Sequence, residues 1–128
     1  MVPNQKILLL DDNKDLLMIV QIILKGQGYE IIVANNIEEA EKKIRIHHPA
    51  LILMDVFIAD QDGRELCNQL KQNPDTSDIR VIMMSGCDSS FGLLNGICAD
   101  DFMQKPFDYN DLLTRVQAQM SYGQGALA

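Results

Sequence analysis

The sequence predicts an α/β fold in which a five-stranded parallel sheet lies between two layers of helices. Two observations indicate it: nearly continuous apolar runs typical of strands buried on both faces, and helical patterns between successive runs. Alternation with short connections favours parallel strands joined by crossover helices. The chain has 128 residues, enough for one domain with a sizeable core. We therefore expect a single domain over residues 1–128, with its core at about 5–121 and a tail or linker at 122–128.

Five segments are predicted to be strands. Three are almost entirely apolar, as strands covered on both faces are, and the last is shorter and more polar. In chain order the predicted strands are KILLL (6–10), YEIIVA (29–34), ALILMDV (50–56), RVIMMS (80–85) and DFMQ (101–104).

Helical patterns occupy the intervals between these runs. Apolar residues recur at helical spacing over 16–24, and Gly26 and Gly28 are expected to end that helix. Further helices are predicted to start where an Asn or Asp precedes an acidic residue three positions on: Asn36, Asp62 and Asp108. A poorer helix is expected over 89–97, whose two glycines each cost about 1 kcal/mol relative to alanine.

Charge and cysteine content exclude several classes of protein. The formal net charge is −7, and no basic run is present, so this domain is not expected to bind nucleic acid or an anionic membrane. The three cysteines, Cys67, Cys87 and Cys98, form no CxxC pair and are read as reduced thiols. No apolar run reaches the roughly 18 residues of a membrane span, and no signal peptide is evident, so a cytoplasmic location is expected.

Polar residues follow the carboxyl ends of the predicted strands, the edge at which open parallel sheets bind ligands. They are Asp11, Asp12, Asp55, Ser85 and Lys105. Taken singly, each has an ordinary explanation: the first two as helix caps, the serine as a turn residue, the lysine as a solvated charge. Asp55 is harder to dismiss, since an unpaired carboxylate beside a buried strand is costly. Their common edge favours a joint site.

The residue types in this set indicate the chemistry. Crowded carboxylates repel one another and take up protons unless a cation neutralises them. An all-oxygen site open to solvent suits Mg²⁺, which also accepts phosphate oxygens as ligands. The spacing suggests Asp55 as a nucleophile toward phosphorus, with Asp11 and Asp12 holding the metal. A lysine and a hydroxyl can bind the remaining phosphate oxygens.

Taken in order, these residues resemble the response-regulator receiver domains of two-component signalling. The matching segments are ILLLDDNKD (7–15), LILMDVFIADQDGREL (51–66), VIMMSG (81–86) and ADDFMQKPF (99–107). The resemblance covers about residues 5–121 and is closest to single-domain receivers that resemble the chemotaxis regulator. It implies a flavodoxin-like doubly wound (βα)5 fold with strand order 2-1-3-4-5.

The resemblance also implies a role for each residue. Asp55 would accept a phosphoryl group from a phosphohistidine of a sensor histidine kinase or a phosphotransfer protein, switching a surface for an output partner that the sequence does not identify. The chain would be a signalling switch that catalyses only its own phosphorylation and dephosphorylation. The resemblance implies that Mg²⁺ (or Mn²⁺) binds to Asp11, Asp12, Asp55 and the main-chain carbonyl of Phe57, and that Ser85 and Lys105 bind the phosphate. It also implies that Ser85 and Phe102 form the switch. Finally, it implies a cis bond before Pro106 and places Gly63 in the turn after the active-site loop.

Some features depart from the family, and alternatives remain. Ala59 stands where the family usually has proline, so a looser loop is expected there. A receiver that docks without being phosphorylated remains open. A haloacid-dehalogenase-like phosphatase would need a second carboxylate where Phe57 stands, and a flavodoxin would need a phosphate-binding loop in place of DDNKD. The sequence is compatible with a stand-alone messenger or with one piece of a longer regulator.

Overall fold

The computed structural model describes residues 4–86 and 99–125. Its central sheet has five parallel strands in the order β2-β1-β3-β6-β7. In sequence order of these five this is 2-1-3-4-5, so the predicted topology is confirmed. The strands are β1 (Lys6–Leu10), β2 (Glu30–Ala34), β3 (Leu51–Asp55), β6 (Arg80–Ser85) and β7 (Asp101–Gln104).

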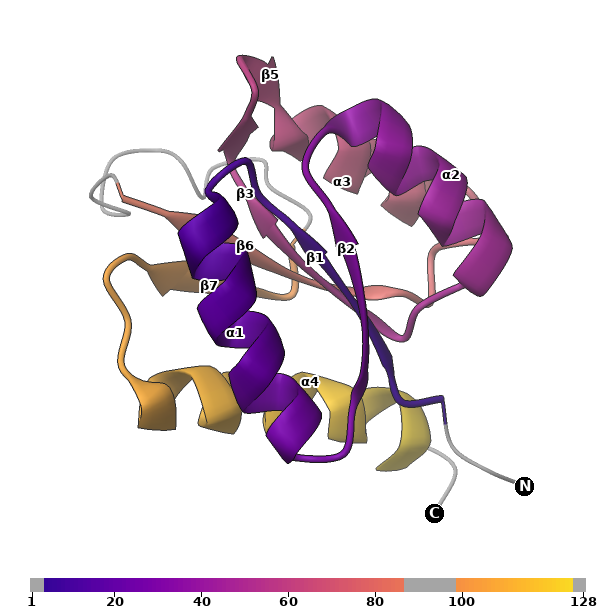
Figure 1. Cartoon of the computed structure of the whole chain (residues 1–128). Helices are drawn as coiled ribbons and strands as arrows, with labels where there is room; N and C mark the ends of the chain where they lie inside the picture. The colour runs from indigo at the N-terminus through magenta and orange to yellow at the C-terminus, as the bar shows by residue number, and fades with distance from the viewer. Residues whose placement is uncertain (1–3, 87–98, 126–128) are drawn as a thin grey trace.

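Helices cover both faces of this sheet. The described helices are α1 (Lys14–Gly26), α2 (Ile37–His47), α3 (Gly63–Gln72) and α4 (Tyr109–Gly125). Helices α1 and α4 lie on one face, and α2 and α3 lie on the other (Figure 1). The helix predicted over 89–97 lies outside the described residues, as do Cys87 and Cys98. No helix within the described ranges is long and apolar enough to cross a membrane.

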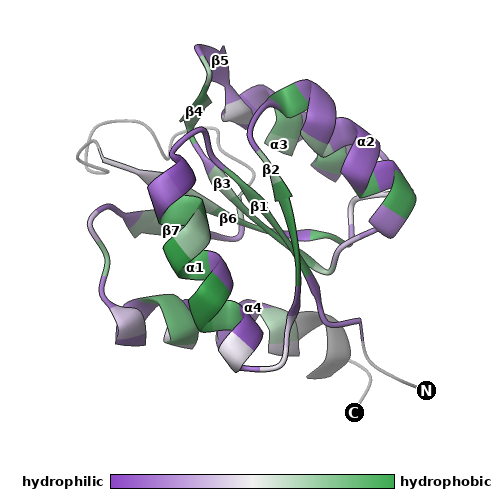
Figure 2. Ribbon diagram, in the orientation of Figure 1, coloured by the Kyte–Doolittle hydropathy of each residue, from purple (hydrophilic) through white to green (hydrophobic). Residues whose placement is uncertain are grey.

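The core consists of two apolar layers that share the strands. Because successive strand residues point to opposite faces, Leu8 and Leu10 pack toward α2 and α3, whereas Ile7 and Leu9 pack toward α1 and α4. All four are almost completely buried. Figure 2 shows the central strands coloured as hydrophobic and the outward side of α2 as largely hydrophilic. Burial on both faces explains why the strand sequences are apolar without alternation.

Three helices begin at the residues that the sequence indicated, and α1 ends at Gly26 as expected. The side chains of Asn36 and Asp108 each accept a hydrogen bond from the backbone N–H three residues on, and Asp62 accepts one from Arg64. Gly28, with φ of 93°, follows the end of α1 in a conformation that favours glycine. Asn13, which the sequence did not single out, caps α1 by accepting from the N–H of Leu16. The aspartates before it are therefore not needed as caps.

Two elements differ from expectation. A small antiparallel hairpin of β4 (Phe57–Ile58) and β5 (Gln61–Asp62), which the sequence did not predict, follows β3. Helix α4 continues through Gly125, into the stretch expected to be a tail. Extending an existing helix adds one hydrogen bond for each residue fixed, which offsets the modest cost of glycine there.

Candidate functional site

Three carboxylates meet at the carboxyl edge of the sheet. Asp11 follows β1 directly, Asp12 is next to it, and Asp55 is the last residue of β3, the strand paired with β1. One oxygen from each carboxylate lies within 4.8 Å of those of the other two. Asp11 is fully buried, whereas Asp12 is exposed. The sheet topology therefore brings together the three acids that the sequence grouped. Asp11 lies in the core, Asp55 is partly buried and Asp12 is exposed to solvent.

Lys105 supplies a cation to two of these acids. Its Nζ lies 2.7 Å from Oδ2 of Asp11 and 3.0 Å from Oδ2 of Asp55. The lysine follows β7, and its backbone N–H donates to the carbonyl of Ser85 at the end of β6 (2.7 Å). The next peptide bond, Lys105–Pro106, is cis, the form that the family resemblance implied. Lys105 thus connects residues at the carboxyl ends of β1, β3, β6 and β7.

The protonation equilibria of the site reflect this crowding. Burial raises the pKa of Asp55, and the charge of Asp11 raises it further, while Lys105 and a backbone hydrogen bond from Phe57 act in the opposite direction. Burial alone would lower the pKa of Lys105, but its bonds to Asp11 and Asp55 and their charges raise it overall. A single ammonium faces three carboxylates here, so the described side chains leave net negative charge at the site.

The remaining predicted residues lie around this cluster. Ser85 is buried at the carboxyl end of β6, beside β3. Phe102, on β7, is partly buried and packs against the core layer of α2 and α3. Phe57 is half-exposed on β4, and the guanidinium of Arg64 lies 5.5 Å from the centroid of its ring. The structure therefore places the serine at the strand edge and the aromatic residue against the core.

The hairpin after β3 contacts the acid cluster in a way that the sequence did not predict. The backbone N–H of Ala59 donates to Oδ2 of Asp12 at 3.1 Å. Ala59 and Asp60 form its tip, with φ of 48° and 66°. Nothing in an alanine indicates a left-handed backbone, which usually costs a non-glycine residue about 1–2 kcal/mol. The absence of proline at position 59 was the available signal, because proline has no N–H and fixes φ near −65°.

Gly63 is required where α3 approaches β3, the strand that ends in Asp55. A Cβ atom at this position would lie 2.6 Å from the main-chain oxygen of Asp55. The N–H of Gly63 also donates to the carbonyl of Val56 at 2.6 Å. Any side chain would therefore push α3 away from β3, so this glycine sets the position of the helix beneath Asp55.

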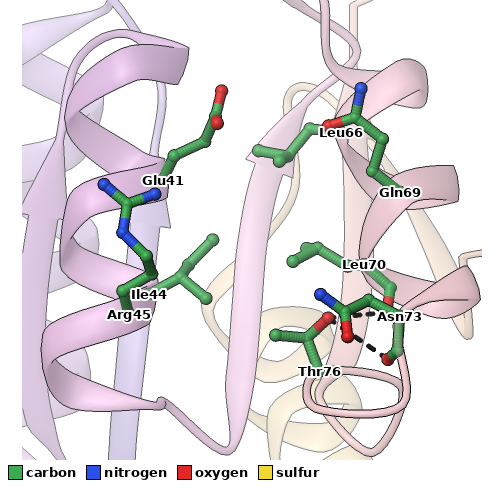
Figure 3. Close-up of a pocket in the computed structure, with 8 residues that line it drawn as sticks. All are labelled: Glu41, Ile44, Arg45, Leu66, Gln69, Leu70, Asn73 and Thr76. Carbon is green, nitrogen blue, oxygen red and sulfur yellow. Dashed lines mark hydrogen bonds between the residues drawn. The ribbon is translucent and has the colours of Figure 1, made fainter.

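A separate hollow of about 180 Å³ lies between α2 and α3 (Figure 3). Its apolar lining comes from Ile44, Leu66 and Leu70, and the polar side chains of Glu41 and Gln69 border it from opposite helices. It lies along the later turns of both helices, whereas the acid cluster lies at the edge where the helices begin. This hollow is therefore distinct from the carboxylate site.

The donor set fits a small divalent cation. Three carboxylates with oxygens this close are a typical oxygen-rich environment for Mg²⁺ or Mn²⁺, and the exposure of Asp12 leaves the mouth open to water and phosphate ligands. The single ammonium of Lys105 leaves charge for such an ion to neutralise. Asp11, Asp12 and Asp55 are the residues that could hold it.

Comparison with known proteins agrees with this geometry. Residues 7–117 match the family model described as the response regulator receiver domain. The chain is 38% identical over 117 residues to the alkaline phosphatase synthesis transcriptional regulatory protein PhoP of Bacillus subtilis, covering 90% of this chain and 48% of that protein. It is 36% identical over 119 residues to the probable transcriptional regulator ycf27 of Pyropia yezoensis, covering 90% and 47%. The chain spans about half the length of these relatives.

Solved structures show the same fold. One is a CheY-like response regulator receiver domain protein from Methanospirillum hungatei, with a TM-score of 0.84, 27% identity and coverage of 95% of this chain and 98% of that one. Another is the signal receiver domain of a signal transduction histidine kinase from Syntrophus aciditrophicus, with a TM-score of 0.84, 29% identity and coverage of 91% and 90%. From its acid cluster, its fold and these matches, the chain belongs to the response regulator receiver domain family.

Proposed function

We propose that this receiver accepts a phosphoryl group on Asp55 from the phosphohistidine of a sensor histidine kinase or a phosphotransfer protein. The observation that carries the proposal is the meeting of three carboxylate oxygens within 4.8 Å, with Lys105 bonded to two of these acids. An assembly of this kind is expensive to maintain for stability alone, because like charges in a partly buried site repel one another. It suits a site that takes up a divalent cation and a phosphate.

In the proposed reaction, a carboxylate oxygen of Asp55 attacks phosphorus. The new oxygen–phosphorus bond forms as the phosphorus–nitrogen bond of the donor histidine breaks, and the imidazole leaves with the electron pair. The ammonium of Lys105 would shift from the carboxylates to bind one phosphoryl oxygen. The hydroxyl of Ser85 would bind another. Mg²⁺ bound by Asp11, Asp12, Asp55 and the Phe57 carbonyl would offset negative charge on the transferring group.

The output of the proposed switch is a change at the surface. Ser85 and Phe102 lie on the neighbouring strands β6 and β7, so an inward shift of the serine could be followed by the aromatic side chain. We propose that this change is read by an output partner or an output domain, since the transcriptional regulators matched are about twice as long as this chain. We place the reaction in the cytoplasm because the sequence has an odd number of cysteines, three, and no CxxC pair, as is usual for proteins of reducing compartments.

Intact-mass measurement after incubation with a small acyl phosphate tests the proposal. We expect a single phosphoryl adduct that requires Mg²⁺ and is absent from Asp55→Asn. The matched control is Asp60→Asn, an exposed acid on the neighbouring hairpin that should keep the adduct. An unmodified wild type in the presence of Mg²⁺ would instead favour a receiver that docks without phosphorylation.

A further inference from the structure

The hairpin tip between β4 and β5 has an unusual backbone. Ala59 and Asp60 are consecutive residues with φ of 48° and 66°, and neither is glycine. Positive φ at both central residues is the requirement of the tight hairpin turns usually built from Asn-Gly or Gly-Gly. Aspartate tolerates this conformation better than alanine does. Ala59 thus adopts a backbone conformation that alanine disfavours, so a contact is needed to offset the cost.

That contact is the hydrogen bond from the Ala59 N–H to Oδ2 of Asp12. The other two acids of the cluster are held differently: Lys105 bonds both Asp11 and Asp55, and the N–H of Asn13 donates to Oδ1 of Asp11. Asp12 is exposed, and within the described part of the chain Lys105 makes no ion pair with it. The Ala59 N–H therefore holds Asp12 in place by a hydrogen bond, as the Lys105 ammonium holds Asp11 and Asp55.

We infer that Ala59 is a positioning residue for the metal site, acting through its backbone N–H on Asp12. The inference rests on the proposed function, in which Asp12 is a metal ligand. A hydrogen bond to one carboxylate oxygen limits the rotation of the side chain and leaves the other oxygen available to a cation. Ordering an exposed side chain before binding reduces the entropy lost when the metal binds, which increases affinity. A proline at position 59 could supply neither the donor nor the positive φ.

Replacing the Ile58–Ala59 amide by an ester tests this inference directly. The ester exchanges the Ala59 N–H for an oxygen and keeps the methyl group and the side chains. The matched control is an ester at the Pro74–Asp75 bond, because the Asp75 N–H also donates to a nearby exposed side chain, Asn73 Oδ1 at 2.9 Å, on the α3–β6 connection. The probe is Mn²⁺, with free ion measured by its electron paramagnetic resonance signal.

We expect the Ala59 ester to weaken Mn²⁺ binding about threefold to tenfold, as loss of one partly exposed hydrogen bond to a charged group would. The Asp75 ester should bind Mn²⁺ as the wild type does. Ala59→Gly, which keeps the N–H and removes the strain, should bind at least as tightly as alanine.

Unchanged affinity in the Ala59 ester would overturn the inference, leaving the bond a structural one. Tighter binding would also overturn it, because the N–H would then compete with the metal for Asp12. These outcomes leave the proposed function intact, provided that the wild type binds Mn²⁺ and forms the Asp55 adduct. A wild type that binds no Mn²⁺ would refute the metal site itself, and this inference with it.

Discussion

The two edges of the sheet handle partly buried charge in opposite ways. At the carboxyl edge, Asp11 and Asp55 share the ammonium of Lys105, and the neighbouring Asp12 accepts a hydrogen bond from the Ala59 N–H instead. At the amino edge, Asp100 lies just before β7 and faces two cations. Lys71 Nζ, from α3, lies 2.8 Å from its Oδ2, and an Arg80 guanidinium nitrogen, from β6, lies 3.3 Å from its Oδ1.

The amino-edge cluster is satisfied by its own residues. The backbone N–H of Val81 donates to Oδ2 of Asp100 at 2.8 Å, and Lys71 also donates to the carbonyl of Ile79 at 2.7 Å. Arg80 donates in turn to the side chain of Gln119 on α4 (2.9 Å). Helix, strand and loop are thus joined without surplus negative charge. This is the pattern of a structural ion network.

The two clusters differ in the sign of the charge left over and not in whether they contain ion pairs. Both clusters are partly buried, and both contain good short contacts. Only the carboxyl-edge cluster, of these two, has more acids than the described cations can neutralise. Each of the following changes tests one side of this difference.

The largest effect is expected at the amino edge. Asp100→Ala should lower the free energy of unfolding by about 2–3 kcal/mol, because Lys71, Arg80 and the Val81 N–H all lose a partly buried acceptor. Urea denaturation measures this change. Asp78→Ala, which removes an exposed acid paired with His48 at 3.3 Å, is the control and should cost less than about 0.5 kcal/mol. A comparable loss in both variants would show that the network is no more than a surface pair.

The second prediction concerns cation binding at the carboxyl edge. Mg²⁺ at about ten times its dissociation constant should raise the free energy of unfolding by about 1.4 kcal/mol if it binds the folded chain alone. Asp12→Ala should abolish most of this gain while lowering metal-free stability by no more than about 1 kcal/mol, through loss of the hydrogen bond from the Ala59 N–H to this exposed side chain. Asp15→Ala, an exposed acid in the first turn of α1, should retain the gain. Equal stabilisation of all three proteins would place the ion elsewhere.

The smallest effect concerns Asp55 without metal. Because its pKa is raised in the folded chain, folded Asp55 keeps its proton to higher pH than the unfolded chain does. Stability should therefore fall as pH rises from the ordinary aspartate range through the raised pKa, and the deficit should persist above it. Asp55→Asn should remove this deficit and stabilise the metal-free protein at neutral pH by no more than about 1 kcal/mol. A pH-independent difference between the two proteins would contradict the assignment.

Much of the fold was predictable because burial dictates sequence along the strands. A strand covered on both faces must be apolar at every position, so β1 and β6 stand out as runs whose ends match the structure. The polar residue that follows such a run has to lie at the sheet edge. For this reason Asp55 and Lys105 could be placed together although they are far apart in the chain.

Features that depend on one backbone torsion or on a tertiary contact could not be predicted. The positive φ of Ala59 has no signature in the residue itself, so the hairpin and its bond to Asp12 were missed. Asp100 was likewise missed, because its partners come from α3 and β6 and no local pattern connects them. Strand order places Lys105 at the same edge as Asp11 and Asp55, but it does not specify which carboxylates the lysine side chain contacts. The bond to Asp11 was therefore not predictable.

The close approach at Gly63 has a consequence for mutational tolerance. With an added Cβ only 2.6 Å from the Asp55 carbonyl, even alanine requires the packed backbones to separate. In a library containing every substitution, this position should therefore tolerate replacement poorly, although glycine has no side chain that could take part in chemistry. The hairpin tip at Ala59, four residues earlier, is exposed and has room for larger side chains, whereas the close approach beneath Asp55 leaves almost no room at position 63.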